Sequence, residues 1–223
     1  SAKAMNRRRF LRHTATAGAA LAAFPTIIPA RVLGADAPSK QITIGFIGTG
    51  GHAIGWNLPK YLKLPDARVV AVCDVDRERM EFAKTAVDEH YKNRDCTMTT
   101  DFREVLARPD IDAVMITTPD HWHTLISVLA LRAGKDVQCE KPTLTVGEGR
   151  TLIETVRKHK KVFQTSTEDR SLPEYHRMAE LVRNGRIGKL QKIEVILPKQ
   201  PLEAGDPKPQ PVPPELDSDM WLG

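Results

Sequence analysis

Cysteine is scarce in this chain of 223 residues, and no disulfide framework can be built from what is present. The three cysteines are Cys73, Cys96 and Cys139, and their spacing is not that of metal ligands. Cys73 and Cys139 fall within apolar runs typical of buried strands. We therefore expect both to be small apolar core residues rather than reactive groups.

The chain also lacks surplus charge outside its first 37 residues. The formal net charge is +5, and residues 1–37 account for all of it, so the remainder balances to zero. The charged residues of this segment are Lys3, Arg7, Arg8, Arg9, Arg12 and Arg31 against Asp36. The basic pI therefore does not indicate a nucleic-acid-binding face, and we expect no nucleic acid partner.

No hydrophobic run near the N-terminus is strong enough to span a membrane. Residues 14–30 are uncharged and rich in alanine, but they are only weakly hydrophobic and contain Pro25 and Pro29. They follow a basic segment, residues 6–12, with the sequence Asn-Arg-Arg-Arg-Phe-Leu-Arg. A basic region before a moderately apolar one is typical of a targeting signal rather than of a folded element.

This N-terminal pattern resembles a twin-arginine leader in which Arg7 and Arg8 form the pair, the alternative being a basic tail. The resemblance implies that residues 1–37 are a leader, that the Tat translocon is a partner during export, and that the protein is periplasmic or otherwise exported. Free dinucleotide is scarce outside the cytoplasm. Any such cofactor is therefore expected to be tightly bound.

From Gln41 onward, apolar runs alternate with helical patterns, which is typical of an α/β fold with a doubly wound parallel sheet. Near-continuous apolar runs indicate strands that are buried on both faces. The expected strands are residues 42–47, 68–73, 113–116, 137–139 and 162–165. The expected helix starts are capping boxes at Asp101 and Thr145, and a further helix spans residues 120–133.

The character of the chain changes after Thr167. Residues 173–184 predict a helix, residues 189–197 predict a strand, and the proline-rich residues 198–214 predict an extended loop. One strand and one loop do not make an independent domain. We expect a leader (1–37), a Rossmann-type NAD(P)-binding domain (38–167), and the start of a truncated α+β substrate domain (168–223).

A glycine-rich turn follows the first expected strand and has the sequence Gly48-Thr-Gly50-Gly51-His52-Ala53. Gly48 permits a tight turn, Gly50 lets the backbone approach a pyrophosphate, and the small Ala53 allows the helix to pack closely on the strand. Phosphates would then bind backbone N–H groups at the helix start, with Gly51 and His52 among the cofactor-binding residues. Pro59 falls within the helix expected after this turn, where it would remove a hydrogen bond. It therefore requires either a late helix start near Asn57 or a kink.

Asp74 ends the second expected strand, where a carboxylate accepts hydrogen bonds from the adenosine ribose hydroxyls. A carboxylate there repels a 2′-phosphate, so the sequence favours NAD over NADP. Arg77 and Arg79 are close enough in sequence to keep NADP as an alternative.

Two further motifs lie at carboxyl ends of expected strands, the edge where doubly wound sheets bind ligands. Residues 117–123 have the sequence Thr-Thr-Pro-Asp-His-Trp-His, and residues 139–142 have the sequence Cys-Glu-Lys-Pro. With the glycine turn, these motifs resemble the Gfo/Idh/MocA family, that of glucose–fructose oxidoreductase and inositol dehydrogenase. The resemblance runs from about Gln41 to Gly223.

The resemblance implies roles for matching residues only. Lys141 would lie beside the nicotinamide and the substrate hydroxyl as the catalytic residue, with Glu140 next to it, while Thr118, Pro119 and His123 would line the nicotinamide side. The residues that enter the expected substrate domain are candidates for sugar contacts: Arg170, Tyr175 and His176. The His-x-His pattern of residues 121–123 lacks further ligands, and we expect no metal site.

These expectations describe an exported NAD(P)-dependent oxidoreductase of sugars or cyclitols that is a homo-oligomer when full-length. One alternative is a redox-neutral, NAD-dependent glycoside hydrolase of the same family. Another is an inactive dinucleotide-binding fragment, because the family's later acid–base histidine segment is not found before residue 223. On the oxidoreductase interpretation, too, the chain alone is expected to turn over poorly.

Overall fold

The computed structural model describes residues 41–196 and 209–223. All that follows concerns the unit Gln41–Gly223. The expected leader and most of the proline-rich loop lie outside the described residues. Within the described part, no helix is both long enough and apolar enough to cross a membrane.

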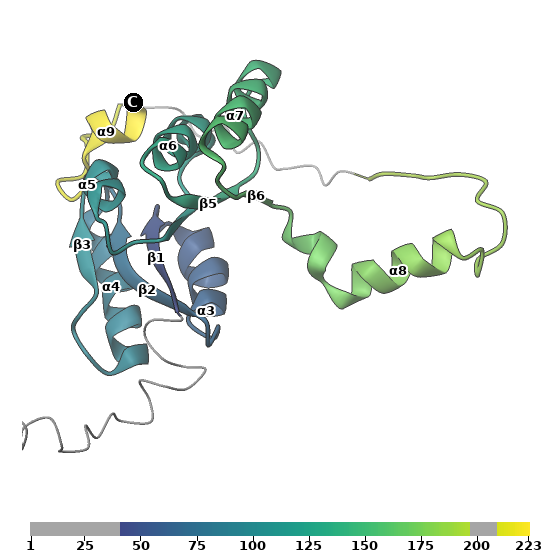
Figure 1. Cartoon of the computed structure of the whole chain (residues 1–223), viewed down its shortest axis with the longest axis horizontal. Coiled ribbons are helices and arrows are strands. Elements are labelled where there is room, and N and C mark those ends of the chain that lie inside the picture. Colours follow the sequence, from purple (N-terminus) through teal and green to yellow (C-terminus); the bar gives the residue numbers. More distant parts are fainter. Residues whose placement is uncertain (1–40, 197–208) are drawn as a thin grey trace, which may run out of the picture. The chain divides into compact units, whose positions relative to one another are not determined.

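Six parallel strands form one sheet in the order β3-β2-β1-β4-β5-β6 (Figure 1). This is the strand order of a Rossmann-type doubly wound sheet, and it confirms the fold class expected from the sequence. The strands are β1 (Ile42–Ile47), β2 (Ala67–Cys73), β3 (Thr97–Thr99), β4 (Ala113–Ile116), β5 (Asp136–Glu140) and β6 (Phe163–Ser166). The sequence did not predict β3, which is short and polar and lies at the edge of the sheet.

Helices connect successive strands and cover both faces of the sheet. They are η2 (Ala53–Asn57), α3 (Leu58–Tyr61), α4 (Arg77–Tyr91), α5 (Phe102–Ala107), α6 (Asp120–Arg132), α7 (Val146–His159), η3 (Glu168–Ser171), α8 (Pro173–Arg183) and α9 (Ser218–Leu222). Helices α3 and α4 share one apolar core with the sheet, and α5, α6 and α7 share the other.

Alternate residues of the central strands supply the two cores, as the period of two in a strand requires. Phe46 and Met115 pack on the α3–α4 side, whereas Ile47 and Cys73 pack on the α5–α7 side. The expectation for the cysteines is confirmed, since all three are free and buried. Burial raises the pKa of the Cys139 thiol to about 12, so this group stays neutral.

The two expected capping boxes have different outcomes. At the start of α7 both reciprocal bonds form, with Thr145 Oγ1 accepting from Glu148 N and Glu148 Oε2 accepting from Thr145 N. At the start of α5, Asp101 caps the helix as expected, but Glu104 does not close the box. Its Oε2 instead accepts a bond from Thr99 Oγ1 at 2.7 Å, because the end of β3 brings that hydroxyl within reach.

The region after β6 departs from the sequence-based expectation. The helix predicted over residues 173–184 is confirmed as α8, although it has no buried residue. The strand predicted over residues 189–197 is wrong for the described part, since residues 189–196 pair with no other strand and their apolar side chains are exposed. An alternating pattern becomes a strand only where a neighbour satisfies its backbone groups, and no described segment supplies one.

Candidate functional site

The loops after β1 and β4 meet at the carboxyl edge of the sheet. These two strands are hydrogen-bonded neighbours, and the connections from them lead in opposite directions along the sheet. Such a switch point leaves a crevice between the two loops, where α/β proteins bind ligands. The glycine turn and the residue 117–123 motif both lie at this edge, as the sequence predicted.

The first glycine of the turn is required by its backbone. Gly48 has φ +87°, and an added Cβ would lie 2.5 Å from the carbonyl oxygen of Thr117. Gly51, by contrast, has nothing within 4 Å of its Cβ position. The turn therefore packs tightly against the end of β4 at Gly48 and leaves open space three residues later, at Gly51, where a ligand can approach the backbone.

The helix that follows the turn accommodates Pro59 through a change from π-helical to α-helical hydrogen bonding. Helical structure is continuous from residue 51 to residue 61, but residues 53–57 form a π-helical turn, after which the α-helix restarts at Leu58. Pro59 then occupies the first turn of α3, where its missing N–H is not needed. The helix does not start late, because helical structure already begins at residue 51; only its α-helical part begins at Leu58, with Asn57 at the N-cap position but without a side-chain capping bond.

A cavity of about 280 Å³ opens beside the glycine turn. The turn lines it through Gly48, Gly50, Gly51 and His52, and the end of β4 lines it through Thr118 and Pro119. Asp74 lines the side next to β2. Seven of the ten predicted cofactor-binding residues therefore surround one space. The other three, His123, Glu140 and Lys141, do not line it.

Asp74 supports the glycine turn as well as facing the cavity. Its Oδ2 accepts hydrogen bonds from the backbone N of Thr49 at 2.5 Å and from Thr49 Oγ1 at 3.0 Å, and its Oδ1 accepts from Asp76 N at 2.9 Å. The carboxylate is only partly buried. Asp74 also lines the cavity, on the side where the sequence predicts a ribose.

Arg79 brings a positive charge to the same rim. Its Nη1 lies 3.4 Å from the position that a Cβ on Gly50 would take, and its Nε pairs with Asp76 Oδ2 at 3.1 Å. The guanidinium thus lies over the glycine turn. A cation in this position suits either a pyrophosphate or a 2′-phosphate.

One buried hydroxyl of the cavity wall is left without a partner. Among the described residues, the buried side-chain oxygens and nitrogens that make no hydrogen bond are Thr118 Oγ1, Thr124 Oγ1 and Ser127 Oγ. Of these three residues, only Thr118 lines the cavity. An orphaned hydroxyl beside a glycine turn fits a ligand that carries polar groups, as a dinucleotide does.

Glu140 lies at the end of β5 in a buried polar network. Its Oε1 accepts a hydrogen bond from Asn57 Nδ2 at 3.0 Å and lies 3.3 Å from His52 Nε2. The same Asn57 amide also donates to Thr117 Oγ1 at 3.2 Å. The network therefore links the helix after the glycine turn to the ends of β4 and β5. Because the Glu140 side chain is 6% exposed, it positions neighbours rather than facing solvent.

His52 connects the cavity to this network. Its ring lines the cavity, and its Nε2 also lies 3.7 Å from Glu168 Oε1. The ligand atoms of His52, Glu140 and Glu168 lie within 4.8 Å of one another, close enough to share a cation. The contacts of His52 Nε2 with both carboxylates account for the cluster without an ion, so it does not by itself indicate a metal.

His123 ties the loops after β4 and β5 together. Its Nε2 lies 2.8 Å from the Thr118 carbonyl oxygen, and its Nδ1 lies 3.0 Å from the Pro142 carbonyl oxygen. The residue is 3% exposed. It therefore holds the two motif-bearing loops in place from behind, rather than presenting its ring to the cavity.

Lys141 follows β5 directly, and its side chain is exposed. Its neighbour Glu140 contacts His52, which lines the cavity. Lys141 is therefore adjacent in sequence to the residue that joins the end of β5 to the cavity wall. The three predicted substrate residues are exposed and do not line the cavity. Arg170 lies in η3, and Tyr175 and His176 lie in α8.

Four contributors to this region belong to no functional motif in the sequence. Asn57 and Glu168 belong to no motif, and only the fold brings them to Glu140 and His52. Met220 and Trp221 also line the cavity, although they lie more than 90 residues after the residue 117–123 motif in the sequence. Contacts between such distant segments depend on topology, which local pattern does not specify.

Comparison with known proteins supports a dinucleotide site. The family model for GFO_IDH_MocA oxidoreductases, an NAD-binding Rossmann fold, matches residues 42–167. A glycosyl hydrolase family 109 protein of Saccharopolyspora erythraea is 32% identical over 170 residues, which cover 69% of this chain and 37% of that protein. The chain spans about half or less of the curated relatives it matches, between 37% and 48% for three of them.

Solved structures give the same result. A myo-inositol 2-dehydrogenase from Lactobacillus plantarum is 28% identical with a TM-score of 0.59, covering 67% of this chain and 43% of that one. The 3-ketoreductase KijD10 from Actinomadura kijaniata, solved with NADP and TDP-benzene, is 25% identical with a TM-score of 0.57, covering 65% and 43%. The cavity, the glycine turn and these likenesses agree, and the chain belongs to the GFO/IDH/MocA family of oxidoreductases.

Proposed function

We propose that the protein is an NAD(P)-dependent oxidoreductase that moves a hydride between a carbinol carbon of a sugar or cyclitol and the nicotinamide. One observation carries the proposal. The glycine turn, Asp74 and Thr118 enclose a single cavity, and His52 leads from that cavity to Glu140, which precedes Lys141. A cofactor laid along this line would place its two ends at Asp74 and at the end of β5.

The residues fit the two ends of a dinucleotide in different ways. The backbone of Gly50 and Gly51 would take the pyrophosphate, and the free lone pairs of Asp74 would take the ribose hydroxyls. When bound, the nicotinamide supplies the hydride acceptor or donor. The chain itself must then orient the substrate hydroxyl and accept or return its proton.

Lys141 is suited to that proton transfer. It follows the last residue of β5, so the sheet fixes where its backbone lies, while the exposed side chain is free to reach a substrate. An amine near a developing alkoxide either stabilises the negative charge as ammonium or takes the proton as amine. Glu140, held by Asn57 and His52, fixes the backbone position from which Lys141 acts.

We propose NAD as the cofactor and keep NADP as the alternative. The Asp74 carboxylate supports NAD, because it disfavours a 2′-phosphate at the ribose. Arg79, which lies over the glycine turn, supports NADP, and the similar ketoreductase KijD10 was solved with NADP. Titration of the chain with both dinucleotides tests the choice, and tighter binding of NADP would overturn it.

The catalytic proposal is tested by Lys141→Ala in any preparation that oxidises a cyclitol or sugar. Turnover should fall by at least about a hundredfold, the scale of a positioned acid–base group. The lysine is exposed, so the melting temperature should not move. Lys158→Ala, which removes a lysine from the far end of α7, is the matched control. Unchanged turnover in Lys141→Ala would remove this residue from the mechanism.

A redox-neutral glycoside hydrolase is the second candidate, favoured by the 32% identity to a glycosyl hydrolase family 109 protein. In that cycle the nicotinamide would accept a hydride from a sugar carbon, loss of a neighbouring proton would eliminate the glycosidic alcohol, water would add to the resulting double bond, and the hydride would return to the sugar. An aryl glycoside would be cleaved with no net change in nicotinamide absorbance. Stoichiometric formation of the reduced nicotinamide would exclude it.

We further propose that residues 1–37 export the protein with its cofactor tightly bound. The basic residues 6–12, followed by a weakly apolar segment, support this. Native protein isolated from the source cells should fractionate outside the cytoplasm and release a dinucleotide on denaturation, as detected by mass spectrometry. Replacement of Arg7 and Arg8 by lysine should retain it inside.

A further inference from the structure

Residues 215–223, here called the C-terminal segment, lie across the carboxyl edge of the sheet. At one end they bind the loop after β2. Arg77 N donates to the Glu215 carbonyl at 3.0 Å, Asp217 N donates to the Val75 carbonyl at 2.9 Å, and Leu216 forms a β-bridge with Asp76. This end is therefore fixed by backbone bonds next to Asp74.

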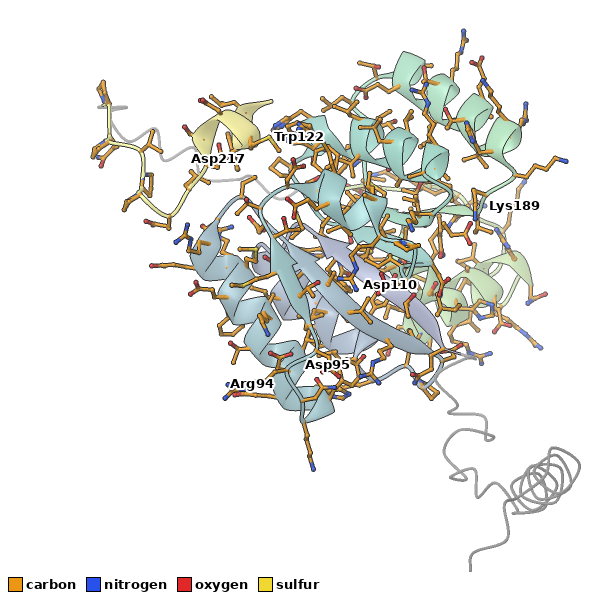
Figure 2. All side chains as sticks on the ribbon, turned by 60° about the vertical axis from the view of Figure 1, so that its left-hand side comes forward. Arg94, Asp95, Asp110, Trp122, Lys189 and Asp217 are labelled. Atoms are coloured by element: carbon orange, nitrogen blue, oxygen red, sulfur yellow. The ribbon has the colours of Figure 1, made fainter. Side chains whose placement is uncertain are left out.

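At the other end, the C-terminal segment binds the start of α6. The carbonyl oxygen of Trp221 lies 2.9 Å from His121 Nε2 and accepts a bond from Trp122 Nε1 at 3.1 Å. Figure 1 shows α9 alongside α5 and α6, and Figure 2 shows it beside the labelled Trp122. The C-terminal segment thus bridges two loops that are separated by the mouth of the cavity.

Between these two anchors, side chains of the C-terminal segment face the cavity. Met220 and Trp221 line it, together with Phe102 and Trp122, whose rings pack edge to face with centroids 5.8 Å apart. This wall is aromatic and apolar, in contrast to the glycine turn opposite. It lies on the Asp74 side of the site, since Val75 and Thr100 line the same cavity.

We propose that the C-terminal segment forms the wall of the subsite for the purine base of the dinucleotide, and that Trp221 contacts the base. This rests on the proposed function, because it requires that the cavity binds a dinucleotide. A flat base next to the ribose-binding Asp74 needs an apolar surface, and an aromatic ring supplies one through its π face. Since both anchors are backbone contacts of the C-terminal segment, binding of the base and docking of this segment stabilise each other.

The test uses the full chain and three probes: ADP-ribose and AMP, which carry the base, and nicotinamide mononucleotide, which does not. Trp221→Ala should weaken ADP-ribose and AMP at least about fivefold, the lower end of what a base–aromatic contact is worth. The nicotinamide mononucleotide affinity should stay within about twofold. Leu222→Ala is the control, because Leu222 belongs to the same helix, is 64% exposed and does not line the cavity.

A second measurement keeps the native side chains. In protein labelled with 5-fluorotryptophan, the ¹⁹F resonance of Trp221, assigned with Trp221→Phe, should shift on saturation with AMP but not with nicotinamide mononucleotide. Equal AMP affinity in wild type and Trp221→Ala, or an unmoved resonance, would overturn the inference while leaving the proposed function intact. If neither NAD nor NADP nor AMP binds the chain, the proposed function fails, and the inference fails with it.

Discussion

The two ends of the crevice differ in how much protein surrounds them. The Asp74 end is walled by the loops after β1, β2 and β4, by Phe102 of α5, and by the C-terminal segment. The Lys141 end is open, and every residue from 141 to 147 is exposed, Val146 by 79%. The first end therefore offers an enclosed binding surface, whereas the second offers a reactive side chain on a fixed strand end.

This difference suggests that affinity and chemistry are set by separate parts of the chain. Substitutions around the cavity should change dinucleotide affinity, and the Lys141→Ala substitution should change turnover with little effect on affinity. The two ends are joined by His52, which lines the cavity and contacts Glu140. Substitutions at one end that alter dinucleotide affinity and turnover equally would contradict this separation.

The largest effect is expected at Gly48, where the enclosed end depends on a close backbone approach. Gly48→Ala must hold an alanine at φ +87° with its Cβ against the Thr117 carbonyl. Strain and displacement together should lower the free energy of unfolding by roughly 3 kcal/mol or more and abolish NAD binding. Urea denaturation and calorimetric titration measure the two effects.

Gly51→Ala is the matched control for that substitution. Nothing lies within 4 Å of its Cβ position, and its φ is not in the left-handed region. The fold should therefore be kept, and any loss of NAD binding would report only the space that the ligand needs. Equal stability of Gly48→Ala and wild type would contradict the packing described for the turn.

A smaller effect is expected at Asp74. Asp74→Ala should weaken NAD binding by about tenfold, because a charge-assisted contact to the ribose is lost. Binding of NADP should weaken less, since a repulsive charge is removed at the same time. Thr49→Val is the control, because it removes one bond to the carboxylate while keeping the charge. Parallel losses for both dinucleotides would mean that Asp74 acts only by holding the turn.

The smallest effect on dinucleotide binding is expected at Tyr61, whose hydroxyl donates a hydrogen bond to Gln138 of β5. Burial, with a further contribution from Glu140, raises the pKa of Tyr61 to about 12 from a reference value of 10.0. Above pH 10 the unfolded chain loses this proton while the folded chain keeps it. The group therefore stabilises the fold fully below pH 10, and this contribution declines toward pH 12.

Tyr61→Phe removes that contribution. The stability of the wild type should fall between pH 10 and pH 12 more steeply than that of the variant, by up to about 1.4 kcal/mol per pH unit. Chemical denaturation at a series of pH values measures the difference between the two slopes, to which the cysteines contribute equally. Identical slopes would show that the hydroxyl is not protected. Dinucleotide affinity at pH 7 should not change.

The sequence predicted those parts of the molecule that are specified locally. Buried strands such as β1 and β4, the turn at Gly48 and the capping box at Thr145 each depend on a few neighbouring residues. The parts it missed depend on distant partners. β3 is polar and exists because β2 pairs with it, whereas residues 189–196 have a strand-like pattern and no partner among the described residues.

The same distinction applies to the site. Motifs placed Gly48, Asp74 and Thr118 around one cavity, because parallel strands end at the same edge. Motifs did not show that Glu140 turns inward to Asn57, nor that Trp221 reaches the cavity from the C-terminal segment. Both contacts depend on where long connections return, which follows from packing of the whole fold.

The ring of His123 lies between the loop after β4 and the loop after β5 and contacts a carbonyl oxygen of each. A neutral imidazole carries a single N–H proton, yet both ring nitrogens of His123 face carbonyl oxygens, which only accept hydrogen bonds. A neutral ring therefore donates to only one of the two carbonyl oxygens, and its tautomer decides whether the β4 loop or the β5 loop receives that hydrogen bond, while the ring lies against both loops.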